Sequence, residues 1–146
     1  MTIQKVEVEK IRSLRSLVLR PGQPIESSDY PLDKEKSTVH YAAKIKDTVV
    51  SIATFYPESI AELDASKPYR LRGMATHPDH RRKGIARALM LKAMTNIIIS
   101  NGDIIWCKAR LVAIGFYESL GFLKIGPVYQ IEGIGPHYTM YKRLLQ

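Results

Sequence analysis

Three consecutive cations stand directly before a glycine in the segment "RRKGIARALM". They are Arg81, Arg82 and Lys83, and Gly84 follows them where a helical pattern of apolar residues begins. Exposed cations at a helix N-terminus oppose the helix dipole by ~0.3–1 kcal/mol each, so helix stability alone does not explain three of them. The unpaired amides of a helix start bind phosphate groups, and a glycine lets the backbone approach the oxygens closely. The segment therefore predicts a site for a phosphate or pyrophosphate.

Two other sequence patterns for phosphates and metals are absent or incomplete. The chain contains neither G-x-x-x-x-G-K-[ST] nor G-x-G-x-x-G, the motifs of P-loops and of dinucleotide-binding folds. His77 and His80 are three residues apart, but no further Cys or His completes a metal site around them. We therefore expect these two histidines to be loop residues, and we predict no metal.

The composition is that of a soluble globular chain with anionic partners. The 146 residues suit one domain, 1–146, and the net charge is +8. Cys107 is the single cysteine and no run reaches the ~20 apolar residues of a membrane span, so we expect a cytoplasmic protein with no membrane partner. Basic residues are scattered and aromatic residues are not interleaved with them, which argues against a nucleic-acid-binding module.

The periodicity of apolar residues predicts an α/β domain. Strands are predicted in "TIQKVEVEK", "TVHYAAKI", "TVVSIATFY", "YRLRGMAT", "DIIWCKAR", "FLKIGPVYQ" and "HYTMYKRLL". Helices are predicted from the apolar positions Ile11, Leu14, Leu17 and Val18, from Ile85, Leu89, Lys92, Ala93, Met94 and Ile97, and in "LVAIGFYESLG". The order is β-α-β-β-β-α-β-α-β-β, with a mixed sheet. Lys46-Asp47 is predicted to close a hairpin, and Gly73 indicates a bulge or a close backbone approach. The Pro- and Ser-rich segment 21–37 is long enough to be a loop beside a substrate.

The segment from Arg81 to Ala86 matches [RQ]-x-x-G-x-[GA], the acyl-CoA loop of the GCN5-related N-acetyltransferases (GNATs). The strand "LRGMATHP", the following helix, the strand "IIWCKAR" and the helix "AIGFYESLGF" also resemble that family in order and spacing. Within it, "VLRPGQPIE", "YRLRGMAT", "WCKAR" and "GIGPHYTMYKR" are similar to the glyphosate N-acetyltransferase type. The resemblance covers nearly the whole chain and is weakest from Ser27 to Thr38.

The resemblance implies a GNAT fold, with a mixed and mostly antiparallel sheet that is split by a bulge in the fourth strand and flanked by helices. It also implies that acetyl-CoA is the co-substrate. Its pyrophosphate would bind the amides from Arg82 to Ala86, and its pantetheine arm would pair with the strand edge at Met74. A hydrogen-bond donor such as the Met74 N–H can stabilise the oxyanion that forms in the reaction by ~2.7–4 kcal/mol. The residues implied in binding acetyl-CoA are Met74, Ala75, Thr76, Arg81, Arg82, Lys83, Gly84, Ile85 and Ala86.

The same resemblance implies the acid and the base of acetyl transfer. Tyr117 in "FYESLGF" occupies the family's position for the general acid beside the sulfur of CoA. His137, which is predicted to open the last strand, is the general base, because an imidazole accepts a proton near neutral pH. We therefore predict an N-acetyltransferase.

Three arginines at the ends or edges of predicted elements match the acceptor-binding positions of the glyphosate type. They are Arg20, Arg72 and Arg110, and the resemblance places His137 with them. Guanidinium groups recognise carboxylates, phosphates and phosphonates with two hydrogen bonds, so these residues imply a small anionic amine as the acceptor. Lys108 stands where related enzymes have a neutral amide, so the rim of the pocket differs here.

Three alternatives stay open at this point. The first is an acetyltransferase whose acceptor is a protein N-terminus, a lysine or another amine. The second is a protein that senses acyl-CoA without turnover, and the third is a nucleic-acid-binding module. The oligomeric state is that of a monomer or a homodimer.

Overall fold

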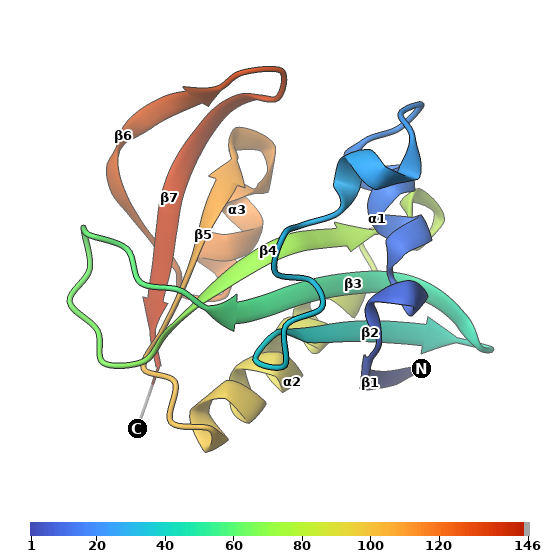
Figure 1. Cartoon of the computed structure of the whole chain (residues 1–146), viewed down its shortest axis with the longest axis horizontal. Helices are drawn as coiled ribbons and strands as arrows, with labels where there is room; N and C mark the ends of the chain where they lie inside the picture. Colours follow the sequence, from blue (N-terminus) through green and yellow to red (C-terminus); the bar gives the residue numbers. More distant parts are fainter. Residues whose placement is uncertain (145–146) are drawn as a thin grey trace. The chain divides into compact units, whose positions relative to one another are not determined.

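The computed structural model describes residues 1–144 (Figure 1). Its strands are β1 (Thr2–Val6), β2 (Val39–Ile45), β3 (Thr48–Pro57), β4 (Pro68–Thr76), β5 (Ile104–Arg110), β6 (Leu123–Ile131) and β7 (Gly135–Arg143), and its α-helices are α1 (Arg12–Leu19), α2 (Ile85–Ile99) and α3 (Ile114–Ser119). Short 3-10 helices are η1 (Val8–Lys10), η2 (Ile25–Ser28), η3 (Pro78–His80) and η4 (Leu111–Ala113). The hydrogen-bonded strand order is β1-β2-β3-β4-β5-β7-β6. The predicted order of elements and the mixed α/β sheet are confirmed.

The chain divides into two compact units. The first unit contains Met1–Tyr56 and Leu71–Ile97, and the second contains Pro57–Arg70 and the chain from Ile98 onward. Strand β4 belongs to both, since its first three residues lie in the second unit and the rest in the first.

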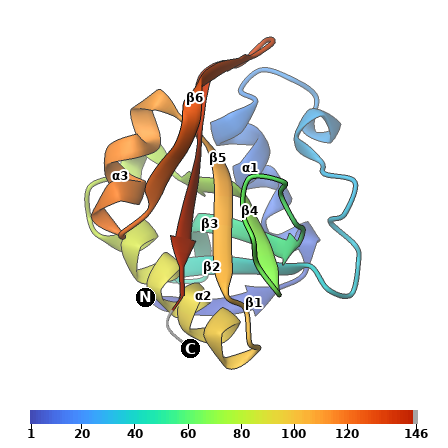
Figure 2. The same ribbon diagram turned by 90° about the vertical axis from the view of Figure 1, so that its left-hand side faces the viewer.

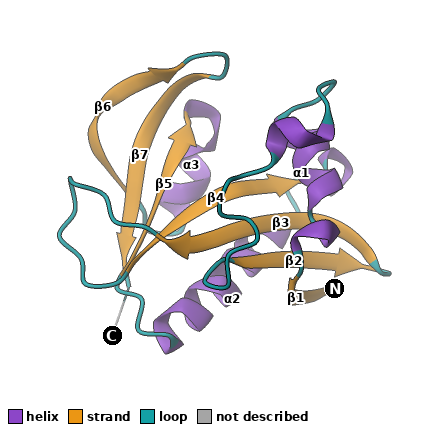
Figure 3. Ribbon diagram, in the orientation of Figure 1, coloured by secondary structure: helices purple, strands orange, loops and turns teal. Residues whose placement is uncertain are grey.

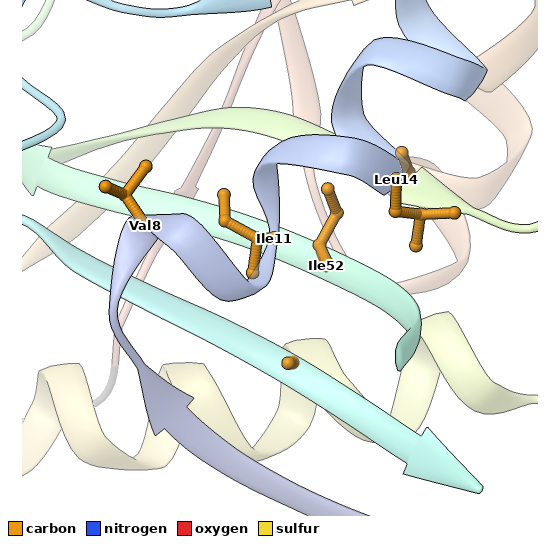
Figure 4. Packing of buried hydrophobic residues seen from close by; sticks show 6 residues of the cluster. Val8, Ile11, Leu14 and Ile52 are labelled. Atoms are coloured by element: carbon orange, nitrogen blue, oxygen red, sulfur yellow. The ribbon is translucent and has the colours of Figure 1, made fainter. Parts of the chain in front are cut away.

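In the first unit, β2 and β3 are buried on both faces. Helices α1 and α2 lie on opposite faces (Figure 2). Residues alternate between these faces with the period of two that the sequence predicts. On one face, Ile52 of β3 packs against Val8, Ile11 and Leu14, and Figure 4 shows these three side chains following the first helical segments above β3. On the other face, the Tyr41 ring meets Phe55 edge-on at 5.8 Å.

The hairpin between β2 and β3 has the predicted turn. Lys46 and Asp47 have φ values of 49° and 65°. Two consecutive positive φ angles are characteristic of a type I′ turn, which matches the right-handed twist of the paired strands. The turn therefore fixes the register in which Lys44 faces Val49 and Ile45 faces Thr48.

The buried face of α2 differs from the prediction at one position. Its buried residues are Ile85, Leu89, Met90, Ala93, Met94 and Ile97. The sequence pattern predicted Lys92 on this face, and that prediction is wrong. Lys92 is exposed and its Nζ donates to the Ile3 carbonyl at 2.6 Å, because a helical turn of 3.6 residues brings Met90, not Lys92, into line with Ala93 and Met94.

The second unit contains strands β5, β6 and β7, helix α3 and the start of β4. Strand β5 is parallel to β4 over Pro68–Arg70 and antiparallel to β7 over its whole length. Side chains of β5 are almost continuously buried, as the apolar run predicts for a central strand. Trp106 of β5 also donates its indole N–H to the Glu58 carbonyl at 2.8 Å.

Several element boundaries differ from those of the sequence analysis. Val8 lies in the 3-10 helix after β1 rather than in the strand, and Leu17 is 54% exposed rather than on the buried face of α1. His137 is the third residue of β7, which begins at Gly135. The predicted last strand extended to Leu145, which lies outside the described residues.

Candidate active site

The start of α2 has the geometry of an anion site. Arg82 and Gly84 have φ values of 61° and 75°, so the backbone turns sharply just before the helix. The Gly84 carbonyl accepts the Ala88 N–H at 3.0 Å, which makes Gly84 the residue that caps the helix. The first amides of an α-helix have no helical carbonyl one turn before them. No acidic residue stands in the first turn.

The space around Gly84 suits the close approach of a phosphate. A Cβ atom added at this residue would have no atom within 4 Å. Crowding therefore does not explain a glycine here, whereas the positive φ and the open space above the backbone do. Cations flank the site, and the Arg81 Nε–H donates to the Thr76 carbonyl at 3.3 Å, which ties the loop to the end of β4. The residues present thus fit a pyrophosphate, the group by which coenzyme A would be held.

Strand β4 carries the irregularity that Gly73 predicts. Gly73 has a φ of 67°, outside the range of a regular strand. The hydrogen-bonded register of β4 with β5 runs only from Pro68 to Arg70, so Leu71–Thr76 lie outside that ladder. A Cβ atom at Gly73 would lie 3.1 Å from Arg15 Nε and 3.2 Å from the Tyr30 ring. Glycine is required here both by the backbone angle and by the approach of these two side chains.

Arg72 is a half-buried cation without a carboxylate partner. Its guanidinium lies 4.0 Å from the centre of the Tyr30 ring, and Nη1 is 3.5 Å from the Tyr56 hydroxyl. Arg15 and Arg70, by contrast, each form an ion pair, with Asp33 at 2.7 Å and with Glu58 at 3.1 Å. In the described part of the chain, no carboxylate lies within ion-pair distance of Arg72.

Arg20 follows α1 directly. Its backbone N–H bonds to the Ser16 carbonyl at 3.0 Å, and its Nη1 donates to the Leu19 carbonyl at 2.8 Å. The side chain thus folds back onto the end of the helix. The first unit therefore contains Arg20, Arg72, the Met74–Thr76 strand end and the loop from Arg81 to Ala86.

In the second unit, two of the predicted acceptor-site residues are neighbours. Arg110 of β5 faces His137 of β7 in the antiparallel register, and His137 faces Tyr129 of β6. Residues that face each other across paired strands project to the same side of a sheet, so the three form a row. The Tyr129 and His137 rings are stacked with centres 6.0 Å apart. Lys108 lies two residues before Arg110 and so projects to the same side.

One hydrogen bond fixes the tautomer of the neutral His137 ring. Its Nδ1 lies 2.8 Å from the Gly135 carbonyl oxygen, which can only accept. Nδ1 therefore carries a proton, and in the neutral ring Nε2 presents a lone pair. The residue is 4% exposed, and its side-chain hydrogen bond to a described residue is the one made by Nδ1. The imidazole is thus oriented to accept a proton at Nε2.

Tyr117 lies in α3 within an aromatic cluster. It is 6% exposed, and the Phe116 and Phe122 ring centres are 5.2 Å and 5.3 Å from its own. Its carbonyl accepts the N–H groups of Leu120 and Phe122, which closes the helix onto β6. Tyr117, Arg110 and His137 all belong to the second unit.

Two tyrosines beside these residues were missed by the sequence analysis. Tyr129 lies outside the motifs of the resemblance, and only its register opposite His137 reveals it. Tyr30 lies in the loop before β2, and its ring contacts both Arg15 and Arg72. The unexplained length of that loop was the only sequence signal for Tyr30.

His77 and His80 lie together just after β4. His77 Nδ1 accepts the Asp79 N–H at 3.1 Å in the 3-10 turn, and the His80 ring meets the His77 ring edge-on at 6.0 Å. Across residues 1–144 there is no group of three His, Cys, Asp or Glu side chains that could hold a metal ion. In the same residues, no helix is long and apolar enough to cross a membrane.

The structure has the irregular fourth strand, and after it the helix that begins next to a glycine, that the resemblance to the GNATs implies. The family profile of the Acetyltransferase (GNAT) domain matches residues 36–124. An uncharacterized N-acetyltransferase of Bacillus subtilis, YitI, is 35% identical over 144 residues, which are 99% of this chain and 97% of the relative. The chain therefore belongs to the GNAT acetyltransferases and is an N-acetyltransferase that uses acetyl-CoA.

Solved structures share the fold at low sequence identity. A putative N-acetyltransferase from Lactobacillus plantarum superposes with a TM-score of 0.82 at 18% identity, covering 99% of this chain and 100% of the other. An aminoglycoside 6'-N-acetyltransferase complexed with coenzyme A superposes with a TM-score of 0.77 at 15% identity, covering 100% of this chain and 98% of the other. Escherichia coli ElaA superposes with a TM-score of 0.79 at 20% identity, covering 97% of this chain and 98% of the other. These similarities confirm the GNAT fold.

Proposed function

We propose that this acetyltransferase is of the glyphosate N-acetyltransferase type and acetylates the primary or secondary amine of a small, multiply anionic acceptor. Acidic amino acids and phosphonate amino acids are such acceptors. The observation that carries the proposal is the state of Arg72, a half-buried cation that lies on an aromatic ring and has no carboxylate partner among the described residues. A cation held away from solvent without a counter-ion favours an anionic ligand.

Arg20 and Arg110 support the same acceptor class. Neither of them forms an ion pair with a described carboxylate, whereas Arg12, Arg15 and Arg70 all do. The proposal assigns Arg20, Arg72 and Arg110 to the negative groups of the acceptor. Cationic acceptors such as polyamines would be repelled by three such arginines.

The chain would hold acetyl-CoA through the first unit. The amides from Arg82 to Ala86 and the neighbouring cations would bind the pyrophosphate, and Met74, Ala75 and Thr76 would pair with the pantetheine arm. Bound acetyl-CoA supplies an acetyl group activated as a thioester. The Met74 N–H would donate to the carbonyl oxygen on which negative charge develops.

His137 and Tyr117 would handle the two protons of the reaction. His137 Nε2 takes a proton from the acceptor nitrogen, whose lone pair forms the new C–N bond. Tyr117 donates its hydroxyl proton to the departing sulfur, which keeps the electron pair of the broken C–S bond. The hydrogen bond from Nδ1 to Gly135 supports this role, because it leaves Nε2 as the free basic atom.

Thiol release from acetyl-CoA tests the proposal across a panel of amines that contains aspartate, glyphosate, 2-amino-3-phosphonopropionate, spermidine and a peptide with a free N-terminus. We expect turnover of the acidic amines alone. Arg72→Gln is expected to raise the KM of the acidic amine about 10- to 100-fold, as for a lost charged hydrogen bond, with the KM of acetyl-CoA unchanged. Arg70→Gln is the matched control, since Arg70 is already paired with Glu58. Turnover of spermidine or the peptide in place of the acidic amines would refute the proposed acceptor.

The donor site has its own test. Gly84→Asp places a carboxylate where the pyrophosphate would bind, and calorimetric titration with acetyl-CoA is expected to show a large loss of affinity. Gly126→Asp is the control, because Gly126 has a φ of 76° and open space around it but lies in β6. Equal affinity in Gly84→Asp and the wild type would remove this loop from the donor site.

A further inference from the structure

The ring of Tyr30 contacts two guanidinium groups. The Cζ atoms of Arg15 and Arg72 are 4.1 Å and 4.0 Å from its centre. Tyr30 therefore joins a fully buried arginine to the half-buried arginine assigned to the acceptor.

A network of buried hydrogen bonds holds Tyr30 in this place. Both carboxylate oxygens of Asp33 accept from Arg15, at 2.7 Å and 3.0 Å, and one of them also accepts the Tyr30 N–H at 2.9 Å. Arg15 Nη2 donates further to Thr54 Oγ1 in β3 at 2.8 Å. Figure 3 shows that the loop that carries Tyr30 and Asp33 passes across β3 and β4.

The network is closed by His40. Its Nε2 lies 2.8 Å from the Asp33 carbonyl and therefore donates; in the neutral ring, Nδ1 then accepts from the Thr54 hydroxyl at 2.7 Å. Thr54 in turn accepts from Arg15, so the donor and acceptor roles are consistent around the ring of contacts. These hydrogen bonds join the loop to β2 and β3 and so hold it in place.

Arg72 has no comparable support of its own. Apart from the Tyr30 ring, its described polar contact is the 3.5 Å approach to the Tyr56 hydroxyl, at the limit of hydrogen bonding. Arginine has several rotatable bonds, so a ligand that must order this side chain loses affinity unless the protein orders it first. The face of Tyr30 is the surface that can do so.

We propose that Tyr30 is a positioning residue for the acceptor: anchored by Arg15 and Asp33, it holds the Arg72 guanidinium in the orientation that binds the negative group of the acceptor. The inference rests on the proposed function of Arg72. It assigns the loop between α1 and β2 a role in acceptor affinity through Arg72 rather than through direct contact.

Kinetics on an acidic amine of the panel test the inference. Tyr30→Leu removes the ring face and is expected to raise the acceptor KM about 3- to 30-fold, with the acetyl-CoA KM unchanged, in line with the strength of a cation–π contact. Tyr30→Phe keeps the ring, and this variant is expected to have the wild-type acceptor KM. In the Arg72→Gln background, Tyr30→Leu is expected to add nothing, because the residue that it positions is gone. An unchanged KM in Tyr30→Leu, or effects that multiply in the double variant, would overturn the inference.

The two proposals fail separately. If Arg72→Gln does not change the acceptor KM, the proposed acceptor site is wrong, whatever Tyr30 does. If Arg72→Gln raises the KM but Tyr30→Leu does not, only the positioning role is wrong. A spectroscopic measurement needs no acceptor: the Arg72 Nε–H signal of 15N-labelled protein is expected to show an upfield ring-current shift that Tyr30→Leu removes and Tyr30→Phe preserves. A signal that Tyr30→Leu leaves in place would also overturn the inference.

Discussion

Removing the carboxylate of Asp33 is expected to be far more damaging than removing that of Asp29. Both residues lie in the loop before β2, and each pairs with an arginine of α1: Asp33 with Arg15 and Asp29 with Arg12. The first pair is 0% and 8% exposed, and the second is 35% and 37% exposed. The comparison therefore isolates the effect of burial at nearly constant chemistry.

The magnitude follows from what Asp33→Ala leaves behind. Arg15 would remain buried with only the Ser28 carbonyl and the Thr54 hydroxyl as acceptors, and the Tyr30 N–H would lose its partner. Removing one partner of a buried ion pair costs about 3–5 kcal/mol. With a urea m-value of about 2 kcal/mol/M, the unfolding midpoint should fall by about 1.5–2.5 M.

Urea titrations followed by circular dichroism measure the difference. Asp29→Ala is expected to move the midpoint much less, and 1 M salt should reduce that small effect because exposed charges are screened. The effect of Asp33→Ala should persist in salt. Asp33→Asn, which keeps the size of the side chain and one acceptor oxygen, should fall between the two and remain folded. Equal midpoints for Asp33→Ala and Asp29→Ala would refute the argument that burial determines the cost.

Three further predictions concern the packing around the site. Ile52→Ala is expected to cost about 2–5 kcal/mol of unfolding free energy in the same titration, because Ile52 is fully buried in the core beneath α1. Gly73→Ala should be destabilising as well. The positive φ alone would lower the unfolding free energy by about 1–2 kcal/mol, and the added methyl group would also press on Arg15 and Tyr30; a wild-type midpoint would contradict this. Burial raises the pKa of the Cys107 thiol to about 12, so the thiol stays protonated at pH 8. Iodoacetamide should label it only when the protein is unfolded, and rapid labelling of the native protein would contradict its burial.

Much of the fold follows from local patterns in the sequence. The order of the elements is correct because each strand or helix carries its own apolar period, with turn residues between them. Gly73 predicted an irregular strand, and the φ of 67° confirms it. The start of α2 was predictable for the same reason, since the cations, the glycine and the first helical residues are neighbours in the chain.

The surroundings of Arg72 could not be predicted in this way. Tyr30 and Asp33 lie in a segment without periodicity, and the Arg15 contact to Thr54 joins residues 39 positions apart. One signal was present: Arg15 follows Ile11 by four residues and therefore falls on the buried face of α1. An arginine in such a position requires an acidic partner, but the pattern does not say which of the distant carboxylates supplies it.

The division of β4 between two units has a consequence for the order in which the protein can fold during synthesis. Neither unit is a continuous stretch of chain, since residues 57–70 belong to the second unit but are made before Leu71–Ile97 of the first. Pro68, Tyr69 and Arg70 must therefore wait for Ile104, Ile105 and Trp106 before their parallel ladder can form. The first unit can be complete once Ile97 has left the ribosome, so the loop that ends at Gly84 can form earlier than the row that contains His137.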